Sequence, residues 1–300
     1  MSVWVRNTLY DRGWAKVKRL PVPVVSVGNI SVGGSGKTSL VKFLASELSK
    51  DIHVAVLLRG YKRKSRGVRV VSQRGKVFLD VKEAGDEAYM LAKTLPSVSV
   101  VVCEDRYAGG LVAVRELGAE LLLLDDGFQH RKLFRDLDLV LLRKRDTSAE
   151  LLPAGPLREP LRSLRRAHAV ILSYQEIEPF EFKDHERVFK MFREFRTLLR
   201  HDFSRAPVET LMDREVIAFA GLGSNDQFFK TLRRLGFKVK KEMSFPDHHD
   251  YGRFKLRDTE VYLTTPKDMV KLPPAENLFA LEPRVRVEGL VPFVKEHLQV

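Results

Sequence analysis

Apolar and polar residues occur in alternating blocks along the first half of the chain. Uninterrupted apolar runs predict strands at 24–28, 54–58, 98–103, 120–125, 137–142 and 168–173. Helical spacing of apolar residues predicts helices between them, at 37–49, 83–94, 106–117 and 158–166. Runs without polar alternation are typical of a parallel sheet that is covered on both faces. The pattern therefore predicts an α/β, doubly wound, mostly parallel sheet, interrupted by a hairpin at 68–79.

The second half carries a shorter series of the same kind. The stretch 175–187 is rich in charged residues and lacks an apolar core pattern, so we place a domain boundary there. Beyond it the sequence predicts strands at 216–220, 237–243, 260–264 and 278–281, with a helix at 225–235. We therefore expect a larger domain over 1–186 and a second, smaller α/β domain over 187–300.

A glycine-rich segment lies between the strand at 24–28 and the helix at 37–49. It reads Ser31-Val32-Gly33-Gly34-Ser35-Gly36-Lys37-Thr38. The spacing and context match the P-loop pattern G-x-x-x-x-G-K-[ST], with Ser31 in place of the first glycine. In a P-loop, backbone amides bind phosphate, the lysine reaches the β- and γ-phosphates, and the hydroxyl is offered to Mg²⁺. A flexible turn before a helix is the alternative, and it is disfavoured by the context.

Carboxylates follow two of the predicted elements. Asp125 and Asp126 end the apolar run at 120–125, where a P-loop enzyme needs an acid to hold Mg²⁺. Capping of a following turn is the alternative. Asp86 stands at the start of a helix, where it is either an N-cap or a base that polarises an attacking hydroxyl.

Basic, amide and aromatic side chains follow several predicted strands. They are Arg59 and Tyr61 in R-G-Y-K-R, Arg106 in E-D-R-Y, Gln129 and His130 after the acidic pair, and Arg158 in P-L-R-E-P. Ligands of open α/β sheets bind beyond the carboxyl ends of the strands, so these residues suggest an anionic substrate; solvated loops are the alternative. His248 in F-P-D-H-H-D-Y suits acid–base chemistry better than zinc, since two adjacent histidines rarely share a metal. Lys267 in T-T-P-K-D is a candidate phosphate ligand.

Charge and composition narrow the class of partner. The 52 Lys and Arg residues exceed the 39 Asp and Glu residues, which gives a net charge of +13 and predicts an anionic partner. No nucleic-acid reader motif is present, so we expect no nucleic acid among the partners. The single cysteine, Cys103, excludes an intramolecular disulfide framework and fits a reducing compartment. No apolar run approaches the roughly 18 residues that span a bilayer.

The first twenty residues suggest a membrane contact. On a continuous helix, Val3, Tyr10, Trp14 and Val17 would lie on one side, and Arg12, Lys16 and Arg19 on the other. Such a basic amphipathic helix binds anionic membranes. Packing against the core of the domain itself is an equally good interpretation.

Nine motifs occur in order between about residues 24 and 270: S-V-G-G-S-G-K-T, R-G-Y-K-R, A-G-D-E, E-D-R-Y, D-D-G-F-Q-H-R, L-P-A-G-P-L-R-E-P, A-G-L-G, F-P-D-H-H-D-Y and T-T-P-K-D. Together they resemble the tetraacyldisaccharide 4′-kinases, the lipid A 4′-kinases of Gram-negative bacteria. The resemblance implies a P-loop NTPase-like fold with two α/β lobes and the active site between them. It implies transfer of the ATP γ-phosphoryl group to the 4′-hydroxyl of a lipid disaccharide 1-phosphate.

The resemblance also implies roles for individual residues. Asp86 matches the catalytic acidic residue and His248 its partner from the second lobe, while residues 31–38 hold ATP. Thr38, Asp125 and Asp126 match Mg²⁺-binding positions. Arg59, Tyr61, Arg106, Gln129, His130 and Arg158 match positions that line the substrate site. We further expect closure of the smaller domain over the site, and a monomer held peripherally on the anionic cytoplasmic face of the bacterial inner membrane. Relatives usually carry a longer hydrophobic N-terminal segment.

Two other functions remain as alternatives. A P-loop GTPase or switch protein would need a base-reading motif, and Thr265-Pro266-Lys267-Asp268 superficially resembles one. A non-enzymatic basic protein of the membrane surface would account for the charge and for residues 1–20. It would leave the P-loop and the carboxylates Asp86, Asp125 and Asp126 unexplained.

Overall fold

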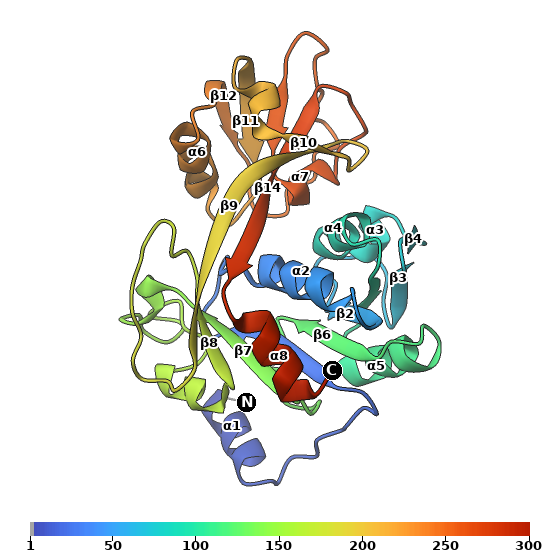
Figure 1. The fold of residues 1–300 in the computed structure, drawn as a ribbon, viewed down its shortest axis with the longest axis vertical. Helices are drawn as coiled ribbons and strands as arrows, with labels where there is room; N and C mark the ends of the chain where they lie inside the picture. Colours follow the sequence, from blue (N-terminus) through green and yellow to red (C-terminus); the bar gives the residue numbers. More distant parts are fainter. Residues whose placement is uncertain (1–2) are drawn as a thin grey trace.

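The structure is a computed structural model that describes residues 3–300, with side chains from Asn7 onward. Its larger part, which we call the P-loop lobe, is built on six parallel strands in the order β5-β2-β6-β1-β7-β8 (Figure 1). These are β1 (Val24–Asn29), β2 (Val54–Leu58), β5 (Ser99–Val102), β6 (Leu121–Asp125), β7 (Leu137–Leu142) and β8 (Ala169–Leu172). The hairpin of β3 (Arg69–Gln73) and β4 (Lys76–Val77) forms an antiparallel edge. The predicted α/β fold with a mostly parallel sheet is confirmed.

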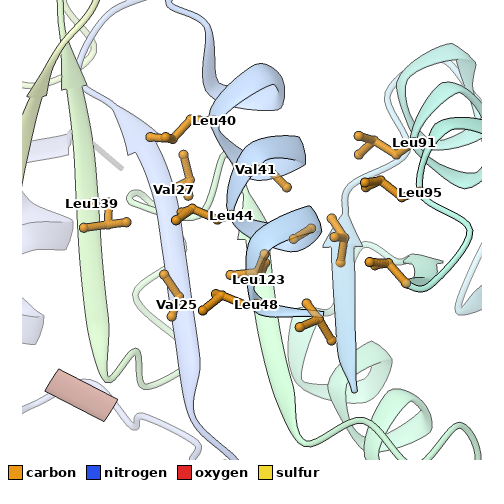
Figure 2. Packing of buried hydrophobic residues seen from close by; sticks show 14 of the residues in the cluster. Val25, Val27, Leu40, Val41, Leu44, Leu48, Leu91, Leu95, Leu123 and Leu139 are labelled. Atoms are coloured by element: carbon orange, nitrogen blue, oxygen red, sulfur yellow. The ribbon is translucent and has the colours of Figure 1, made fainter. Parts of the chain in front are cut away.

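Helix α2 (Lys37–Leu48) carries the P-loop lobe's main packing face. Its residues Leu40, Leu44 and Leu48 are buried at helical spacing against Val25 and Val27 of β1 (Figure 2). Helices α3 (Val81–Ala84) and α4 (Asp86–Thr94) contribute to the same core, and α5 (Arg106–Arg115) contacts β2 and β5. Burial of α2 on the sheet fixes the loop that precedes it, and so fixes the phosphate-binding segment.

The smaller part, the C-terminal lobe, has a core of its own. It contains β10 (Arg205–Pro207), β11 (Glu215–Ala220), α6 (Asn225–Arg234), β12 (Lys238–Ser244), β13 (Tyr262–Thr264) and α7 (Pro266–Met269). Two long antiparallel strands, β9 (Val188–Arg200) and β14 (Leu278–Val287), connect it to the P-loop lobe (Figure 1). Residues 188–190 of β9 pair with β8, so the two lobes share one continuous sheet path.

The chain returns to the P-loop lobe at its end. Helix α8 (Leu290–Leu298) buries Leu290, Phe293 and Val294 in the same cluster as α2 and β1. Lys295 of this helix also pairs with Asp51, at 2.6 Å. The domain boundary predicted near residue 186 stays a prediction. It assigned the segment of α8 to the smaller domain, whereas α8 packs in the core of the P-loop lobe.

Most predicted elements are present with ends shifted by at most three residues, but two predicted helices were wrong and several elements were missed. The helix expected at 83–94 is two helices, because Gly85 has φ +85° and ψ 149°, a conformation that essentially only glycine adopts. The segment 158–166 forms only a 3₁₀ helix, Leu161–Arg166, after Pro160. Strands β9 and β10, helices α7 and α8 and the second half of β14 were not predicted.

The N-terminal helix is shorter than expected. Helix α1 covers Val3–Asp11, so Trp14 and Val17 lie beyond it, with exposed fractions of 69% and 45%. They do not extend a helical face that includes Tyr10, and the side chain of Val3 lies outside the described residues. The two remaining 3₁₀ helices are Lys144–Asp146 and Val208–Leu211. Across residues 3–300, no helix is both long and apolar enough to cross a membrane.

Candidate active site

The phosphate-binding loop joins β1 to α2 at the carboxyl edge of the parallel sheet. Gly33 and Gly36 both have φ +90°, the left-handed region that favours glycine, and Gly36 caps the N-terminus of α2. Ser35 is buried and accepts a hydrogen bond from the Asn29 side chain at 2.9 Å. A loop held in this way presents backbone amides and a helix N-terminus to phosphate.

Arg143, which follows β7, holds the outer side of this loop. Its guanidinium donates to Gly34 O at 3.1 Å, Val32 O at 3.1 Å and Ser31 Oγ at 3.0 Å. The fully buried Asp146 balances its charge. These bonds fix the carbonyl oxygens of Val32 and Gly34 and the fully buried side chain of Ser31, so Arg143 holds the loop in one conformation.

Arg143 was not predicted from the sequence, and neither was a second donor to Gly34 O. The Tyr174 hydroxyl, which lies after β8, also donates to Gly34 O, at 2.9 Å. Tyr174 has φ +62°, and the guanidinium of Arg193 on the connecting strand β9 lies 4.1 Å from its ring centroid. The signal available in the sequence was position: Arg143 and Tyr174 each come just after an apolar strand close to the P-loop strand.

Asp125 and Asp126 end β6 beside the P-loop, but their surroundings differ. Asp125 is buried and its Oδ2 accepts a hydrogen bond from the Thr38 hydroxyl at 2.9 Å. Asp126, at φ +55°, pairs with Lys37 Nζ at 3.4 Å and accepts two hydrogen bonds from Arg158, at 3.0 and 3.2 Å. The cations Lys37 and Arg158 therefore balance Asp126, whereas Asp125 faces only a hydroxyl at hydrogen-bonding distance.

The pKa values of these two carboxyls reflect that difference. Burial raises the pKa of Asp125 to about 7, with a further contribution from the negative charge of Glu87. Burial also opposes ionisation of Asp126, but the positive charges of Lys37 and Arg158 outweigh it and lower the pKa of that carboxyl. An uncompensated buried carboxylate next to a P-loop threonine is suited to a cation.

The donor set fits Mg²⁺. Among residues 3–300, no group of three or more His, Cys, Asp or Glu side chains is arranged as a metal cage. Mg²⁺ in nucleotide-binding sites is normally held by one or two protein oxygens, with substrate phosphates and waters completing its octahedron. The Thr38 hydroxyl and the Asp125 carboxylate supply such a pair of oxygens.

Asp86 and His248 meet from opposite lobes. Asp86 is the first residue of α4 and is 8% exposed; His248 follows β12 in the C-terminal lobe, with φ +60°. His248 Nδ1 lies 2.8 Å from Asp86 Oδ2. Burial opposes ionisation of Asp86, but the hydrogen bond to His248 and the charges of Lys267 and Lys271 outweigh it and lower its pKa. The structure thus brings together the two residues that the sequence placed 162 positions apart.

The other predicted site residues, which we call the rim residues, differ in how far their side chains are exposed. Arg59 and Tyr61 are exposed, and the Tyr61 ring lies 5.0 Å from that of His248. Arg106 is buried and donates to Cys103 O at 3.0 Å. Burial, with the positive charges of Arg106 and Arg135 adding to it, lowers the pKa of His130 to about 4, so its imidazole is neutral at neutral pH.

Gln129 is engaged inside the protein rather than open to a ligand. Its amide donates to Asn29 O at 2.8 Å and to Glu159 Oε1 at 3.1 Å. The fully buried Glu159 also accepts from Asn7 of α1 at 2.7 Å and from Arg166 at 2.9 Å. This cluster docks α1 against the P-loop lobe, which supports the packing interpretation of that helix. Glu159 was not singled out in the sequence.

Comparisons with known proteins identify the family of this chain. A family model described as Tetraacyldisaccharide-1-P 4'-kinase matches residues 1–299. The chain belongs to this kinase family. A tetraacyldisaccharide 4'-kinase of Aquifex aeolicus (strain VF5) is 59% identical over 283 residues, which cover 94% of this chain and 90% of that protein. One from Syntrophus aciditrophicus (strain SB) is 37% identical over 310 residues, covering 93% and 83%.

A solved structure extends the agreement to three dimensions. It is a crystal structure of LpxK from Aquifex aeolicus, described as an "apo" form in complex with ATP at 2.2 Å resolution. Its TM-score is 0.93 at 57% sequence identity, with 99% of this chain and 94% of that chain covered. The expected tetraacyldisaccharide 4'-kinase family is confirmed, and the GTPase alternative is not favoured.

The role of Ser31 can be tested by restoring the consensus glycine. We predict that Ser31→Gly weakens ATP binding, because the loop loses a hydrogen bond to Arg143 worth about 1 kcal/mol, a roughly fivefold rise in the Kd for ATP. Isothermal titration calorimetry measures this directly. Ser31→Ala should show a similar rise, which separates loss of the hydroxyl from glycine flexibility. Tighter ATP binding by Ser31→Gly would contradict the interpretation.

Proposed function

We propose that this chain transfers the γ-phosphoryl group of ATP to the 4′-hydroxyl of a tetraacyldisaccharide 1-phosphate. The contact between Asp86 and His248, which joins the two lobes, is the observation that carries the proposal. The protein thus combines a carboxylate that can accept a hydroxyl's proton with a P-loop that suits a nucleotide. The family's name, and the ATP of the related Aquifex structure, support the same donor and acceptor.

In this proposal the P-loop lobe positions the nucleotide. The amides of residues 31–38 and the N-terminus of α2 bind the phosphates. When ATP binds, Lys37 leaves its ion pair with Asp126 and contacts the β- and γ-phosphates instead. Thr38 and Asp125 would hold Mg²⁺, and Asp126 lies next to them in the chain and beside Lys37. Mg²⁺ supplies positive charge to the phosphate oxygens. Because phosphoryl transfer has a loose transition state, positioning and charge contribute more than the base.

Asp86 acts as the base. Its lowered pKa keeps it a carboxylate at neutral pH, and it accepts the proton of the attacking hydroxyl as the bond to phosphorus forms. His248 holds the carboxylate in place across the lobes. A low pKa makes Asp86 a weak base, which suits a reaction in which the hydroxyl proton leaves late.

The rim residues would bind the acceptor. Arg59, exposed, and Arg106 act on each other electrostatically, so an anion between them would be stabilised. Tyr61, 59% exposed and beside His248, offers a ring face to a sugar. Neutral His130 can exchange hydrogen bonds with hydroxyl groups. We propose that Arg158 and Gln129 act by holding Asp126 and the loop after β6.

Transfer of labelled phosphate from ATP to the lipid disaccharide 1-phosphate in detergent micelles tests the function. We predict that Lys37→Ala lowers turnover more than His248→Ala, since the lysine acts on the transferred group and the histidine acts through Asp86. Lys50→Ala, an exposed lysine just past α2, should stay within about twofold of the wild type. Equal losses for Lys37→Ala and His248→Ala would contradict the ranking. Steady ATP hydrolysis without a lipid product would contradict the function.

We also propose that the C-terminal lobe closes over bound ATP, with β9 and β14 as the hinge. Small-angle scattering should show a smaller radius of gyration with a non-hydrolysable ATP analogue than without it. The same data give the molecular mass, for which we expect a monomer. The Lys37→Ala variant, which binds the analogue poorly, is the control and should not contract. Identical profiles with and without analogue in the wild type would contradict closure.

Membrane association at the cytoplasmic face of the inner membrane is the remaining proposal. Trp14 is 69% exposed beside Arg12, whose guanidinium lies 5.0 Å from its ring centroid. We predict that the protein cosediments with vesicles containing anionic lipid, and that Trp14→Ser lowers the bound fraction severalfold. Phe78→Ser is the matched control, since Phe78 is also exposed, at 48%, beside Lys76. Equal binding by the two variants would contradict the proposal.

A further inference from the structure

So far the T-T-P-K-D segment has entered the site only through the charge of Lys267, which lowers the pKa of Asp86. It forms the short helix α7, whose start is fixed by internal hydrogen bonds. The Thr265 hydroxyl donates to Asp268 Oδ2 at 2.7 Å, and the fully buried Asp268 also accepts from Gly221 N at 3.0 Å. This turn places Lys267 next to the pair formed by Asp86 and His248. Helix α7 also contacts α4, the helix that begins with Asp86.

Lys267 contacts three groups at this point. Its ammonium lies 3.1 Å from Asp247 Oδ1, 3.2 Å from His248 Nε2 and 3.5 Å from Glu87 Oε1, and its side chain is 15% exposed. Burial opposes its charge, but Glu87, Asp86 and Asp247 outweigh burial and raise its pKa. Lys267 is therefore an ammonium group, which can only donate hydrogen bonds.

That restriction determines where the proton of His248 lies. A ring nitrogen that receives a hydrogen bond from an ammonium group must be unprotonated, so Nε2 is the acceptor. The single ring proton then lies on Nδ1, which donates to Asp86 Oδ2 at 2.8 Å. The carboxylate of Asp86 can only accept, so one arrangement satisfies all three groups.

We propose that Lys267 is a positioning residue that keeps His248 as the neutral Nδ1–H tautomer by occupying Nε2. The inference rests on the proposed roles of Asp86 and His248. Its significance lies in the carboxylates that flank the ring, Asp86 on one side and Asp247, 3.7 Å from Nε2, on the other. Without the ammonium, both would favour a second proton on the ring.

The other charged and titratable groups around the ring do not replace Lys267. Lys271 Nζ lies 3.8 Å from Asp86 Oδ2 but 2.8 Å from Asp268, and the Tyr61 ring is tilted by 57° against the His248 ring. Glu87 faces Lys267 rather than the ring.

The arrangement makes His248 a holder of Asp86 and not a proton relay. When the acceptor hydroxyl attacks the γ-phosphorus of ATP, the new O–P bond forms as the bond from phosphorus to the bridging oxygen breaks and ADP leaves. The hydroxyl's O–H bond breaks and an O–H bond forms on Asp86. The proton stays on Asp86 until product leaves, because both nitrogens of His248 are engaged. A doubly protonated ring would bind the carboxylate more tightly and make it a poorer base.

Nitrogen-15 NMR of histidine ring nitrogens in the full-length protein at pH 6, with the non-hydrolysable ATP analogue bound, tests the proposal. In the wild type we expect a protonated Nδ1 and an unprotonated Nε2 for His248, assigned by comparison with His248→Gln. In Lys267→Met we expect both nitrogens protonated at the same pH. Lys271→Met is the matched control, since it removes an ammonium close to Asp86 without touching Nε2, and should keep the wild-type signature.

Kinetics supply a second readout. We expect the kcat of Lys267→Met to fall about tenfold or more at pH 6 and less at pH 8, with the KM for ATP unchanged. Lys267→Arg, which keeps a donor and a charge, should recover part of the loss. A merely structural role would lower kcat equally at both pH values.

Two results would overturn the proposal: a doubly protonated or Nε2–H ring in the wild type, or an unchanged ring in Lys267→Met. The proposed function fails by a different result, full turnover by Asp86→Asn. The NMR readout does not depend on turnover, so the two failures are distinguishable.

Discussion

One hydrogen bond between a carboxylate and an imidazole makes a single site from two lobes. Gly85 separates α3 from α4, so Asp86 is the first residue of α4. His248 lies in a loop of the other lobe, with φ +60°. Their contact at 2.8 Å requires that the lobes face each other at this point. The P-loop alone could bind a nucleotide, and the C-terminal lobe alone has no phosphate-binding loop. In the proposed reaction, the acceptor's hydroxyl and the donor's phosphate meet where both lobes contribute.

Charge balance explains how so many ionised groups share this small volume. Asp126 is balanced by Lys37 and Arg158, and Asp86 lies close to Lys267 and Lys271. Buried carboxylates left without such partners are costly, and Asp125 is the member of the set with only a hydroxyl in contact. Its raised pKa is the electrostatic counterpart of a site suited to a cation. This difference in charge balance distinguishes Asp125 from Asp126, which the sequence alone could not do.

The sequence predicted the parallel sheet and the P-loop because both leave local patterns. A strand buried on both faces is apolar throughout, and a phosphate loop needs glycine at fixed spacing. The order of motifs was enough to identify the family, which is confirmed. Contacts between distant segments were not visible. Arg143 reaches Ser31 across 112 positions, so a serine that departs from the consensus could not be connected with its partner.

The missed elements have a physical explanation as well. Strand β9 mixes charged and apolar residues because its middle section lies between the lobes rather than inside either core, so it lacks the pattern of a buried strand. Helix α1 ends at Asp11, whereas the spacing of Tyr10, Trp14 and Val17 suited a longer helix. There the competing factor is local: Gly13, at φ +70°, ends the helix in a Schellman motif, in which Trp14 N donates to Leu9 O and Gly13 N donates to Tyr10 O.

The position of α8 has a consequence for how the protein is made. Leu290, Phe293 and Val294 fill the core around α2 and β1, although the ribosome adds them only after the whole C-terminal lobe. The C-terminal lobe is thus topologically an insertion, entered by β9 and left by β14. During synthesis the first lobe must wait, with part of its core uncovered, until the second lobe has been completed. The nucleotide-binding half can therefore mature only after the half that meets it, so no finished P-loop lobe exists before its partner.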